Sequence, residues 1–333
     1  MQPLAITLGD PAGIGPEVAA KVISRVSIDK LLRPLLFIGN PESLFLAGEA
    51  AGCSSQLDCL EIVEGPEKLN MGLGLIALDG LPKSFSFGKI HAKCGDIAVR
   101  SIELAISYCM SQRVDGMVTC PINKAAIHAA GYINDLGHQE ILARVTGSRV
   151  TATMLMTPGL RVAHLSTHKS LVNAAKYVKK ANILQKILLV AETMESWGFS
   201  NLRIGVAALN PHGGEEGILG KEEIDEIQPA VLEASKVVNV VGPIPADSIF
   251  NRAISGEFDV VLAMYHDQGH IAIKVHNFHE STTATMGIPF VRTSVDHGTA
   301  FDIAGQGIAN PQGLISAIEM ANALVDGSIS RTS

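Results

Sequence analysis

The chain has 333 residues, of which 47% are hydrophobic and 18% are charged. These values are typical of two globular domains or one large α/β unit, and they exclude a disordered or fibrous chain. The net charge is −7 without a run of basic residues, and no apolar run approaches the roughly 20 residues of a spanning helix, so we expect neither nucleic acid nor a membrane as partner.

Short apolar runs alternate with helical periods along the chain. The predicted strands are 4–8, 34–39, 114–120, 150–157, 160–167, 202–210 and 258–265. The predicted helices are 18–26, 41–52, 95–113, a tract at 171–197 with one break, 221–236 and 311–326. This alternation predicts an α/β fold with a mainly parallel sheet and helices on its faces. The closely spaced runs 150–157 and 160–167 predict a hairpin.

The cysteines and the first residues predict the compartment. Five cysteines are scattered along the chain and form no CxxC pair, which favours reduced thiols over a disulfide framework. The first ten residues lack the basic and apolar regions of a signal peptide. We therefore expect a cytoplasmic protein.

Three predicted strands each deliver a histidine just beyond their ends: His168, His212 and His266. The carboxyl ends of parallel strands share one edge of the sheet, where ligands bind. Three imidazoles there could hold one cation with open positions, and imidazole suits Zn, Co, Ni or Fe better than Mg. A single loop histidine is more often satisfied by water or backbone. The shared position after strands favours a metal or catalytic site for the three together.

The other histidines near these strands have a structural interpretation. His164 lies inside a predicted strand, which is typical of a core residue whose hydrogen bonds are satisfied. His270, His276 and His279 follow His266, and we expect at least two of them on the surface.

A glycine-rich turn at 7–17 joins the first strand to the first helix, with Pro16 suited to a first helical position. Such a turn can hold an anion on its backbone N–H groups. Its glycines do not have the GxGxxG spacing, and no Gly-Lys-Ser/Thr follows. A tight turn that serves packing explains it equally well.

Two further stretches carry polar side chains that could bind substrate. Asn123, Lys124 and His138 follow the strand at 114–120, and an irregular segment at 292–311 is rich in Asp, His, Gly and Thr. A loop of this length and composition is generally functional. Lys274 and Arg292 are candidate cations for an anionic substrate. For each of them, a surface salt bridge is the alternative.

Long motifs in these stretches resemble the 4-hydroxythreonine-4-phosphate dehydrogenase family of pyridoxal phosphate biosynthesis. The motifs are TLGDPAGIGPE, CPINKAAIHAAGY, GHQE, STH, NPHGGEEG, GPIPAD, AMYHDQGHIAIK and RTSVDHGTAFDIAG, and they cover nearly the whole chain. The last motif is also similar to a loop of isopropylmalate and isocitrate dehydrogenases. The resemblance implies their two-lobed α/β/α sandwich, with the active site in the cleft between lobes 1–130 plus 300–333 and 131–299. It also implies a homodimer whose partner contributes to each site.

The resemblance implies the chemistry and its residues. Family members oxidise a secondary alcohol with NAD or NADP and one divalent metal (Zn, Co, Ni or Mg), and the β-keto acid formed can lose CO2. The implied metal ligands are His168, His212 and His266. Implied substrate contacts are His138, Lys274 and Arg292, with Asp247 reaching in from the partner. The residues implied at the nicotinamide cofactor are Gly298, Thr299, Ala300 and Asp302.

Two positions depart from the family pattern. Gln139 stands where the motif usually has threonine, and Thr283 stands where it usually has asparagine. Both lie where the substrate phosphate is expected, so the substrate stays open between 4-phosphohydroxy-threonine, as in pyridoxine biosynthesis, and 4-phospho-threonate, 4-phospho-erythronate or an aromatic cis-dihydrodiol.

The reaction class and the general base also have alternatives. A metal-dependent hydrolase or lyase would need no redox cofactor, and a metal- or anion-binding module would show no turnover. The candidates for the general base are His138, Lys274 and Asp247.

Overall fold

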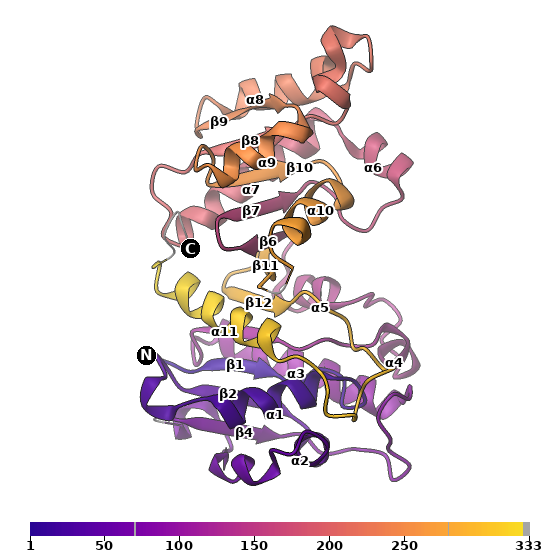
Figure 1. Cartoon of the computed structure of the whole chain (residues 1–333), viewed down its shortest axis with the longest axis vertical. Coiled ribbons are helices and arrows are strands. Elements are labelled where there is room, and N and C mark those ends of the chain that lie inside the picture. Colours follow the sequence, from indigo (N-terminus) through magenta and orange to yellow (C-terminus); the bar gives the residue numbers. More distant parts are fainter. Residues whose placement is uncertain (70, 279, 329–333) are drawn as a thin grey trace. The chain divides into compact units, whose positions relative to one another are not determined.

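The computed structural model describes residues 1–69, 71–278 and 280–328 (Figure 1). They form two compact units. The first consists of Met1–Val150 with Ile288–Val325, and the second consists of Thr151–Gly287 with residues 326–328. The lobes expected at 1–130 plus 300–333 and at 131–299 stay a prediction about domains.

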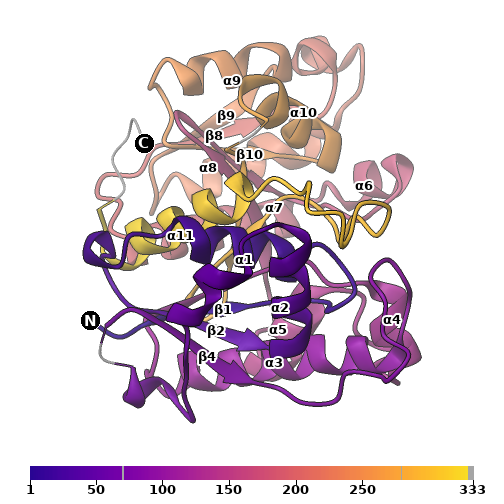
Figure 2. The same cartoon turned by 60° about the horizontal axis from the view of Figure 1, so that its bottom comes forward.

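The first unit contains a sheet in which every recorded strand pair is parallel. Its strands are, in spatial order, β3 (Glu61–Ile62), β4 (Leu73–Ala77), β2 (Leu35–Gly39), β1 (Leu4–Thr7), β5 (Gly116–Thr119) and β12 (Val291–Val295). The helices are α1 (Gly15–Arg25), α2 (Pro41–Ala50), α3 (Ala92–Met110), α4 (Lys124–Ala129), α5 (His138–Thr146) and α11 (Gln312–Val325). Figure 2 shows α1 and α11 on one face of this sheet and α3 on the other.

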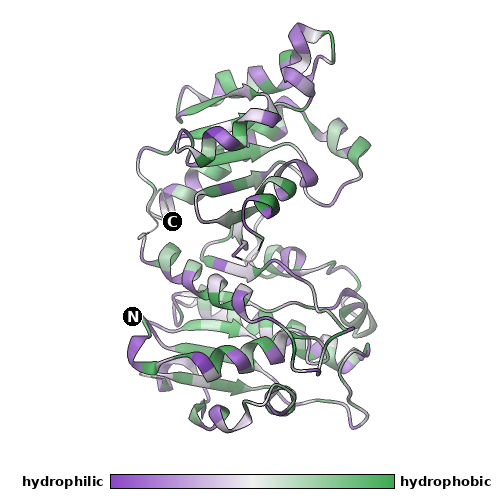
Figure 3. Cartoon of the chain, viewed as in Figure 1, coloured by the Kyte–Doolittle hydropathy of each residue, from purple (hydrophilic) through white to green (hydrophobic). Residues whose placement is uncertain are grey.

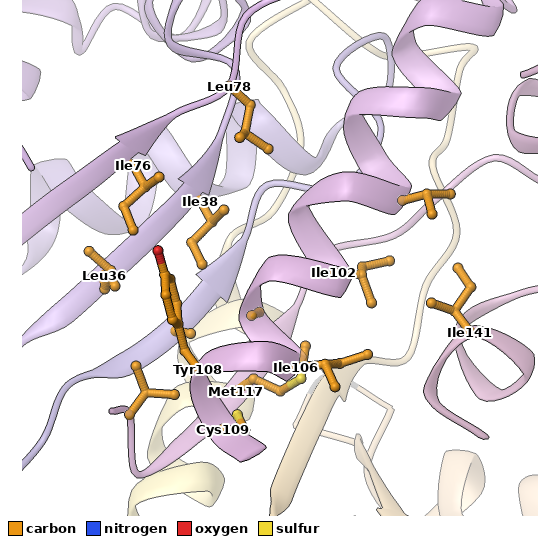
Figure 4. Close-up of a cluster of buried hydrophobic side chains, with 14 of the residues drawn as sticks. Leu36, Ile38, Ile76, Leu78, Ile102, Ile106, Tyr108, Cys109, Met117 and Ile141 are labelled. Atoms are coloured by element: carbon orange, nitrogen blue, oxygen red, sulfur yellow. The ribbon is translucent and has the colours of Figure 1, made fainter. Parts of the chain in front are cut away.

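The core of the first unit lies between α3 and the sheet (Figure 4). Ile102 and Ile106 of α3 are fully buried in one cluster with Leu36, Ile38 and Met117 of the strands. Each such side chain contributes about 1.5–3 kcal/mol on burial. Because every strand pair described above is parallel, the carboxyl ends of these strands share one edge of the sheet.

The second unit contains a mixed sheet. Its strands are, in spatial order, β11 (Thr282–Met286), β6 (Ala152–Thr157), β7 (Leu160–His164), β10 (Val260–Ala263), β8 (Ile204–Ala207) and β9 (Val240–Ile244). The pairs of β6 with β11 and β7 are antiparallel, and the pairs from β7 to β9 are parallel. The helices are α6 (Leu171–Tyr177), α7 (Lys180–Ser196), α8 (Gln228–Ala234), α9 (Ala246–Ile254) and α10 (His266–His276).

Shorter helical turns complete the two units. They are η1 (Ile28–Lys30), η2 (Ser54–Cys59), η3 (Pro66–Lys68), η4 (Pro211–Gly217) and η5 (Glu223–Ile227). Figure 3 shows hydrophobic residues concentrated in the strands and hydrophilic ones on the outer faces of the helices. Among the described residues, no helix has the length and apolarity that crossing a bilayer requires.

The predicted α/β class with mainly parallel strands is confirmed, as are the hairpin of β6 and β7 and the break in the tract 171–197. Two predictions of local structure were wrong. The segment from Arg292 was expected to be irregular, but β12 continues to Val295, because its alternating residues pair with β5. The strand predicted to Tyr265 ends at Ala263, and α10 begins at His266. The apolar run continues through Met264 and Tyr265, so hydrophobicity alone does not indicate where the strand ends.

Candidate functional site

The glycine-rich turn after β1 is held against two distant segments. Gly9 has φ +71°, and a Cβ there would lie 2.2 Å from the Pro121 carbonyl oxygen, so only glycine fits this position. The Ile14 amide donates to the Thr299 carbonyl oxygen at 3.0 Å. The turn therefore packs against the segment expected to bind the nicotinamide cofactor. This contact agrees with the interpretation that the turn serves packing, and anion binding by the turn stays a prediction.

A buried ion pair on α1 fixes the continuation of that segment. The Glu17 carboxylate accepts from the backbone N–H groups of Gly307 (3.2 Å) and Ala309 (2.7 Å). Lys21 Nζ bonds Glu17 at 2.9 Å and donates to the carbonyl oxygens of Gly307 (2.9 Å) and Ala309 (2.6 Å). This pair, which the sequence did not indicate, ties an otherwise irregular segment to a helix near the other end of the chain.

His138 and Arg292 meet in the first unit. His138 begins α5, and Arg292 on β12 is 3% exposed and donates through Nη2 to Thr119 Oγ1 at 2.6 Å. Burial lowers the pKa of Arg292 to about 9, so its guanidinium is still charged at neutral pH. Desolvation, and secondarily the Arg292 charge, hold the pKa of His138 well below 6.5. The pair therefore combines a buried cation with a neutral imidazole.

The proton on His138 can be placed from its partners. The ring bonds the Cys120 carbonyl, whereas its buried Nε2 has no hydrogen-bond partner in the part of the chain that the structure describes. Nδ1 therefore carries the proton, and Nε2 presents a lone pair. A neutral imidazole with an unused lone pair beside a buried guanidinium can accept a proton or a hydroxyl hydrogen bond from an anionic ligand.

Two more buried oxygens lie at this edge of the sheet. Within residues 1–69, 71–278 and 280–328, Thr7 Oγ1 and Asp10 Oδ2 have no hydrogen-bond partner. Desolvation raises the pKa of Asp10 to about 6, although the Ala12 amide, 2.8 Å from Oδ1, opposes the shift. Buried polar atoms are seldom left without partners. Thr7 and Asp10 are therefore candidates for hydrogen bonds to a ligand, in addition to the predicted residues.

The three strand-end histidines all lie in the second unit. They follow β7, β8 and β10, which are neighbouring parallel strands with β10 in the middle. His168 and His212 are exposed, and the His266 side chain is 42% exposed. Among the described residues, no group of three His, Cys, Asp or Glu is arranged to hold a metal ion within this chain. The ligand set therefore stays a prediction.

The backbone around His212 adopts an unusual conformation. Six consecutive residues from His212 to Gly217 have positive φ, and His212 itself has φ 53°. The buried Glu223 carboxylate accepts from the backbone N–H groups of Leu209 and Asn210, both at 2.8 Å. Left-handed conformations in residues other than glycine cost energy and cluster at functional sites. Glu223 thus holds the entry to a strained loop that presents His212.

The donor chemistry of His266 fits a metal ligand. Its Nδ1 lies 2.6 Å from Asp267 Oδ1, so the proton lies on Nδ1 and the lone pair on Nε2. A carboxylate on the other ring nitrogen is the usual support for a ligating histidine. Imidazole nitrogens suit zinc, cobalt or nickel better than magnesium.

The other predicted residues of the second unit are spread over three elements. Lys274 lies on α10 with Nζ 5.4 Å from the centre of the Phe278 ring. Asp247 is exposed in the first turn of α9, and Thr283 is half-buried on β11 opposite Leu155 of β6. In the first unit, Gln139 is the second residue of α5.

The cofactor residues lie in one irregular stretch of the first unit. They are Gly298, Thr299, Ala300 and Asp302, and all of them are exposed or half-exposed. Ala300 has φ 40°, a conformation that is uncommon outside glycine.

The buried position predicted for His164 is confirmed. The prediction of at least two surface residues among His270, His276 and His279 stays open, because His279 lies outside the described residues. His164 is buried as predicted, but Nδ1 of the half-buried His270 lies 3.1 Å from its Nε2, and the His270 ring stacks on His266. His276 is exposed, and His279 lies outside the described residues. The spacing from His266 to His270 puts the two on one face of a helix, but the helix itself was not predicted.

Comparison with known proteins connects this geometry to a family. The family described as "Pyridoxal phosphate biosynthetic protein PdxA" matches residues 32–321. D-threonate 4-phosphate dehydrogenase of Cupriavidus necator is 41% identical over 95% of each chain. The enzyme of that name from Salmonella typhimurium is 39% identical over 96% of this chain and 97% of its own.

The crystal structure of 4-hydroxythreonine-4-phosphate dehydrogenase from Klebsiella pneumoniae is similar to this chain, with a TM-score of 0.87 and 35% identity. The similarity covers 98% of this chain and 100% of that chain. It confirms the fold that the resemblance implied.

Proposed function

Because this chain belongs to the PdxA family of pyridoxal phosphate biosynthetic proteins, we propose that it is a metal-dependent dehydrogenase. It oxidises the secondary hydroxyl of a small phosphorylated hydroxy acid with NAD or NADP. The observation that carries the proposal is the neutral His138 with an unprotonated Nε2 beside the buried Arg292.

In the first unit, Arg292 binds the substrate anion and His138 is the general base. The Arg292 guanidinium binds a carboxylate or phosphate, and its burial strengthens the attraction because the local dielectric is low. His138 Nε2 accepts the proton of the substrate hydroxyl as general base, which a ring protonated at neutral pH could not do. Gln139, Lys274 and Thr283 are further substrate contacts, and Asp247 reaches the site of the partner in a homodimer.

The bound groups complete the chemistry. His168, His212 and His266 would hold the divalent cation, and Gly298, Thr299, Ala300 and Asp302 would lie at the nicotinamide cofactor. When bound there, the cation would lower the pKa of the substrate hydroxyl and the nicotinamide would supply the hydride acceptor. The His266–Asp267 hydrogen bond supports this assignment because it leaves Nε2 as the ligating nitrogen. The β-keto acid produced can then lose CO2.

The expected substrate is D-threonate 4-phosphate. The relatives from C. necator and S. typhimurium are named as dehydrogenases of this compound. In addition, Gln139 and Thr283 depart from the motif expected of 4-hydroxythreonine-4-phosphate dehydrogenases. A β-hydroxy acid with a terminal phosphate offers an anion for Arg292 at one end and a hydroxyl for His138.

The test is NADH formation with divalent metal present. It compares D-threonate 4-phosphate with 4-phosphohydroxy-threonine, 4-phospho-erythronate and an aromatic cis-dihydrodiol. Turnover of 4-phosphohydroxy-threonine alone would contradict the substrate assignment and indicate pyridoxine synthesis. Turnover of the dihydrodiol alone would contradict a phosphorylated substrate. Failure to bind NAD or NADP would contradict the dehydrogenase itself and favour a metal-dependent hydrolase or lyase.

A further inference from the structure

Three imidazole rings of the second unit form a connected series. His164 ends β7 and is buried, His270 lies on α10, and His266 is the first residue of that helix. His164 Nε2 lies 3.1 Å from His270 Nδ1. The His270 ring stacks on the His266 ring with centroids 3.6 Å apart and planes 12° apart. The series runs from the interior of the unit to a half-exposed histidine.

The hydrogen-bond partners determine where the protons lie. His164 Nδ1 lies 3.4 Å from the Thr153 carbonyl oxygen, which can only accept. Burial, and secondarily His270, lower the pKa of His164 to about 3, so its ring is neutral and its Nε2 accepts. His270 Nδ1 is therefore the donor, shared between His164 Nε2 and the His266 carbonyl oxygen, each 3.1 Å away. One set of tautomers satisfies all three contacts.

The backbone of α10 leaves room for this series at a single residue. A Cβ at Gly269 would lie 2.3 Å from His164 Nε2 and 2.7 Å from Val162 Cγ1. Gly269 is buried and helical, and glycine inside a helix is less favourable than alanine. The glycine allows the His164 ring to pass close beside the helix and reach His270.

We propose that His164 and His270 are positioning residues that fix the ring of His266 for the divalent cation. The inference rests on the proposed function, because it takes His266 as a metal ligand. His270 holds one face of the His266 ring by stacking, and His164 anchors His270 to the strand through the hydrogen bond described above. Asp267 bonds the edge of the same ring.

The expected effect follows from preorganisation. A side chain that begins a helix and is 42% exposed would lose rotamer freedom when it binds a metal, and this loss weakens binding. Stacking and the hydrogen bond to Asp267 restrict the ring before the metal arrives. Removing an outer partner of a metal ligand usually weakens metal binding by about 10–100-fold.

The experiment measures Co²⁺ and Zn²⁺ binding to the full-length protein, by the visible absorption of Co²⁺ and by chelator competition for Zn²⁺. Four variants are compared with the unsubstituted protein: His270→Ala, His270→Phe, Gly269→Ala and His266→Ala. His276→Phe is the matched control, because His276 lies on the same helix and bonds the Pro158 carbonyl at 3.0 Å without touching His266. The melting temperature without metal reports folding.

The inference predicts about tenfold weaker Co²⁺ binding in His270→Ala and an altered Co²⁺ spectrum. His270→Phe keeps a ring for stacking but loses the bond to His164. Its Co²⁺ affinity should therefore lie between those of the unsubstituted protein and His270→Ala. It replaces His270→Ala in the comparison if the alanine variant does not fold. Gly269→Ala weakens binding by displacing His164, and His276→Phe leaves it unchanged.

Two results would overturn the inference, and they differ in what else they overturn. If His266→Ala abolishes binding but His270→Ala and His270→Phe bind Co²⁺ with unchanged affinity and spectrum, the positioning role is wrong and the metal site stands. If the unsubstituted protein binds neither metal, the proposed metal dependence fails as well.

Discussion

The candidate groups of the two units differ in how far folding prepares them. In the first unit, Glu17 and Arg292 are buried with hydrogen-bond partners, and desolvation keeps His138 neutral. In the second, His168 and His212 are exposed. Buried groups acquire their protonation states from the fold and take part in its stability, whereas exposed groups stay solvated until a ligand replaces the water. Substitutions of the buried Glu17 or Arg292 should therefore affect activity and stability together, and those of the exposed His168 or His212 should affect ligand binding alone.

The most severe test of this contrast is His138→Gln. Loss of a general base lowers kcat by about 10²–10⁴-fold, and the KM for NAD should not change. Because the pKa of His138 lies well below 6.5, the ring stays neutral as the pH falls through 6.5, and kcat/KM should show no histidine limb there. Steady-state kinetics between pH 5 and 8 measure both quantities. A limb near 6.5 that disappears in the variant would contradict the neutral buried imidazole.

His212→Ala tests the other side of the contrast. Removing a direct ligand should weaken Zn²⁺ binding by at least about 100-fold, more than the loss of an outer partner. The melting temperature without metal should change little, because His212 is exposed. Chelator competition gives the metal affinity and calorimetry gives the melting temperature. The control is His276→Ala, because His276 is also exposed but lies outside the predicted ligand set, and it should retain full metal affinity. Unchanged Zn²⁺ affinity in His212→Ala would remove His212 from the ligand set.

A smaller effect is expected from Glu17→Gln. The amide cannot reproduce both acceptor bonds to the backbone at 307–309 and the ion pair to Lys21. A hydrogen bond to a charged group contributes about 1.5–3 kcal/mol, part of which orders the cofactor segment. We expect the KM for NAD to rise about tenfold while the KM for substrate stays constant. Equal increases in both KM values would indicate general loosening and contradict a local role.

The smallest expected effect is a gain in stability from Asp10→Asn. The folded pKa is about 6 against 3.8 for an ordinary aspartate, so the native state binds more protons between these values. Native stability therefore falls as the pH rises from about 4 to 6 and stays low above it. At pH 8 the variant should be more stable by about 1 kcal/mol, less than the full shift implies because a buried amide also needs partners. Urea unfolding at pH 5 and 8, with Asp58→Asn as an exposed control, gives the comparison. A larger gain at pH 5 than at pH 8 would contradict the predicted shift.

Local patterns were sufficient for much of the fold and for the strand-end histidines. Apolar runs and helical periods depend on neighbouring residues, so the strands β1, β2, β5, β6, β7, β8 and β10 and the long helices were predictable. The position of His212 after β8 and of His168 after β7 follows from the same periods.

What only the tertiary structure decided are the relations between distant segments. The order of strands puts β10 between β7 and β8, and this brings His164 beside the helix that starts at His266. The pairing of β5 with β12 brings Arg292 to Thr119, and the packing of α1 brings Glu17 to Ala309. Residue periodicity carries no information about which strands become neighbours, because that choice depends on burial and backbone hydrogen bonding across the whole sheet. The sequence by itself therefore determined the elements and the chemistry at their ends, whereas desolvation, tautomers and the histidine series came from tertiary packing.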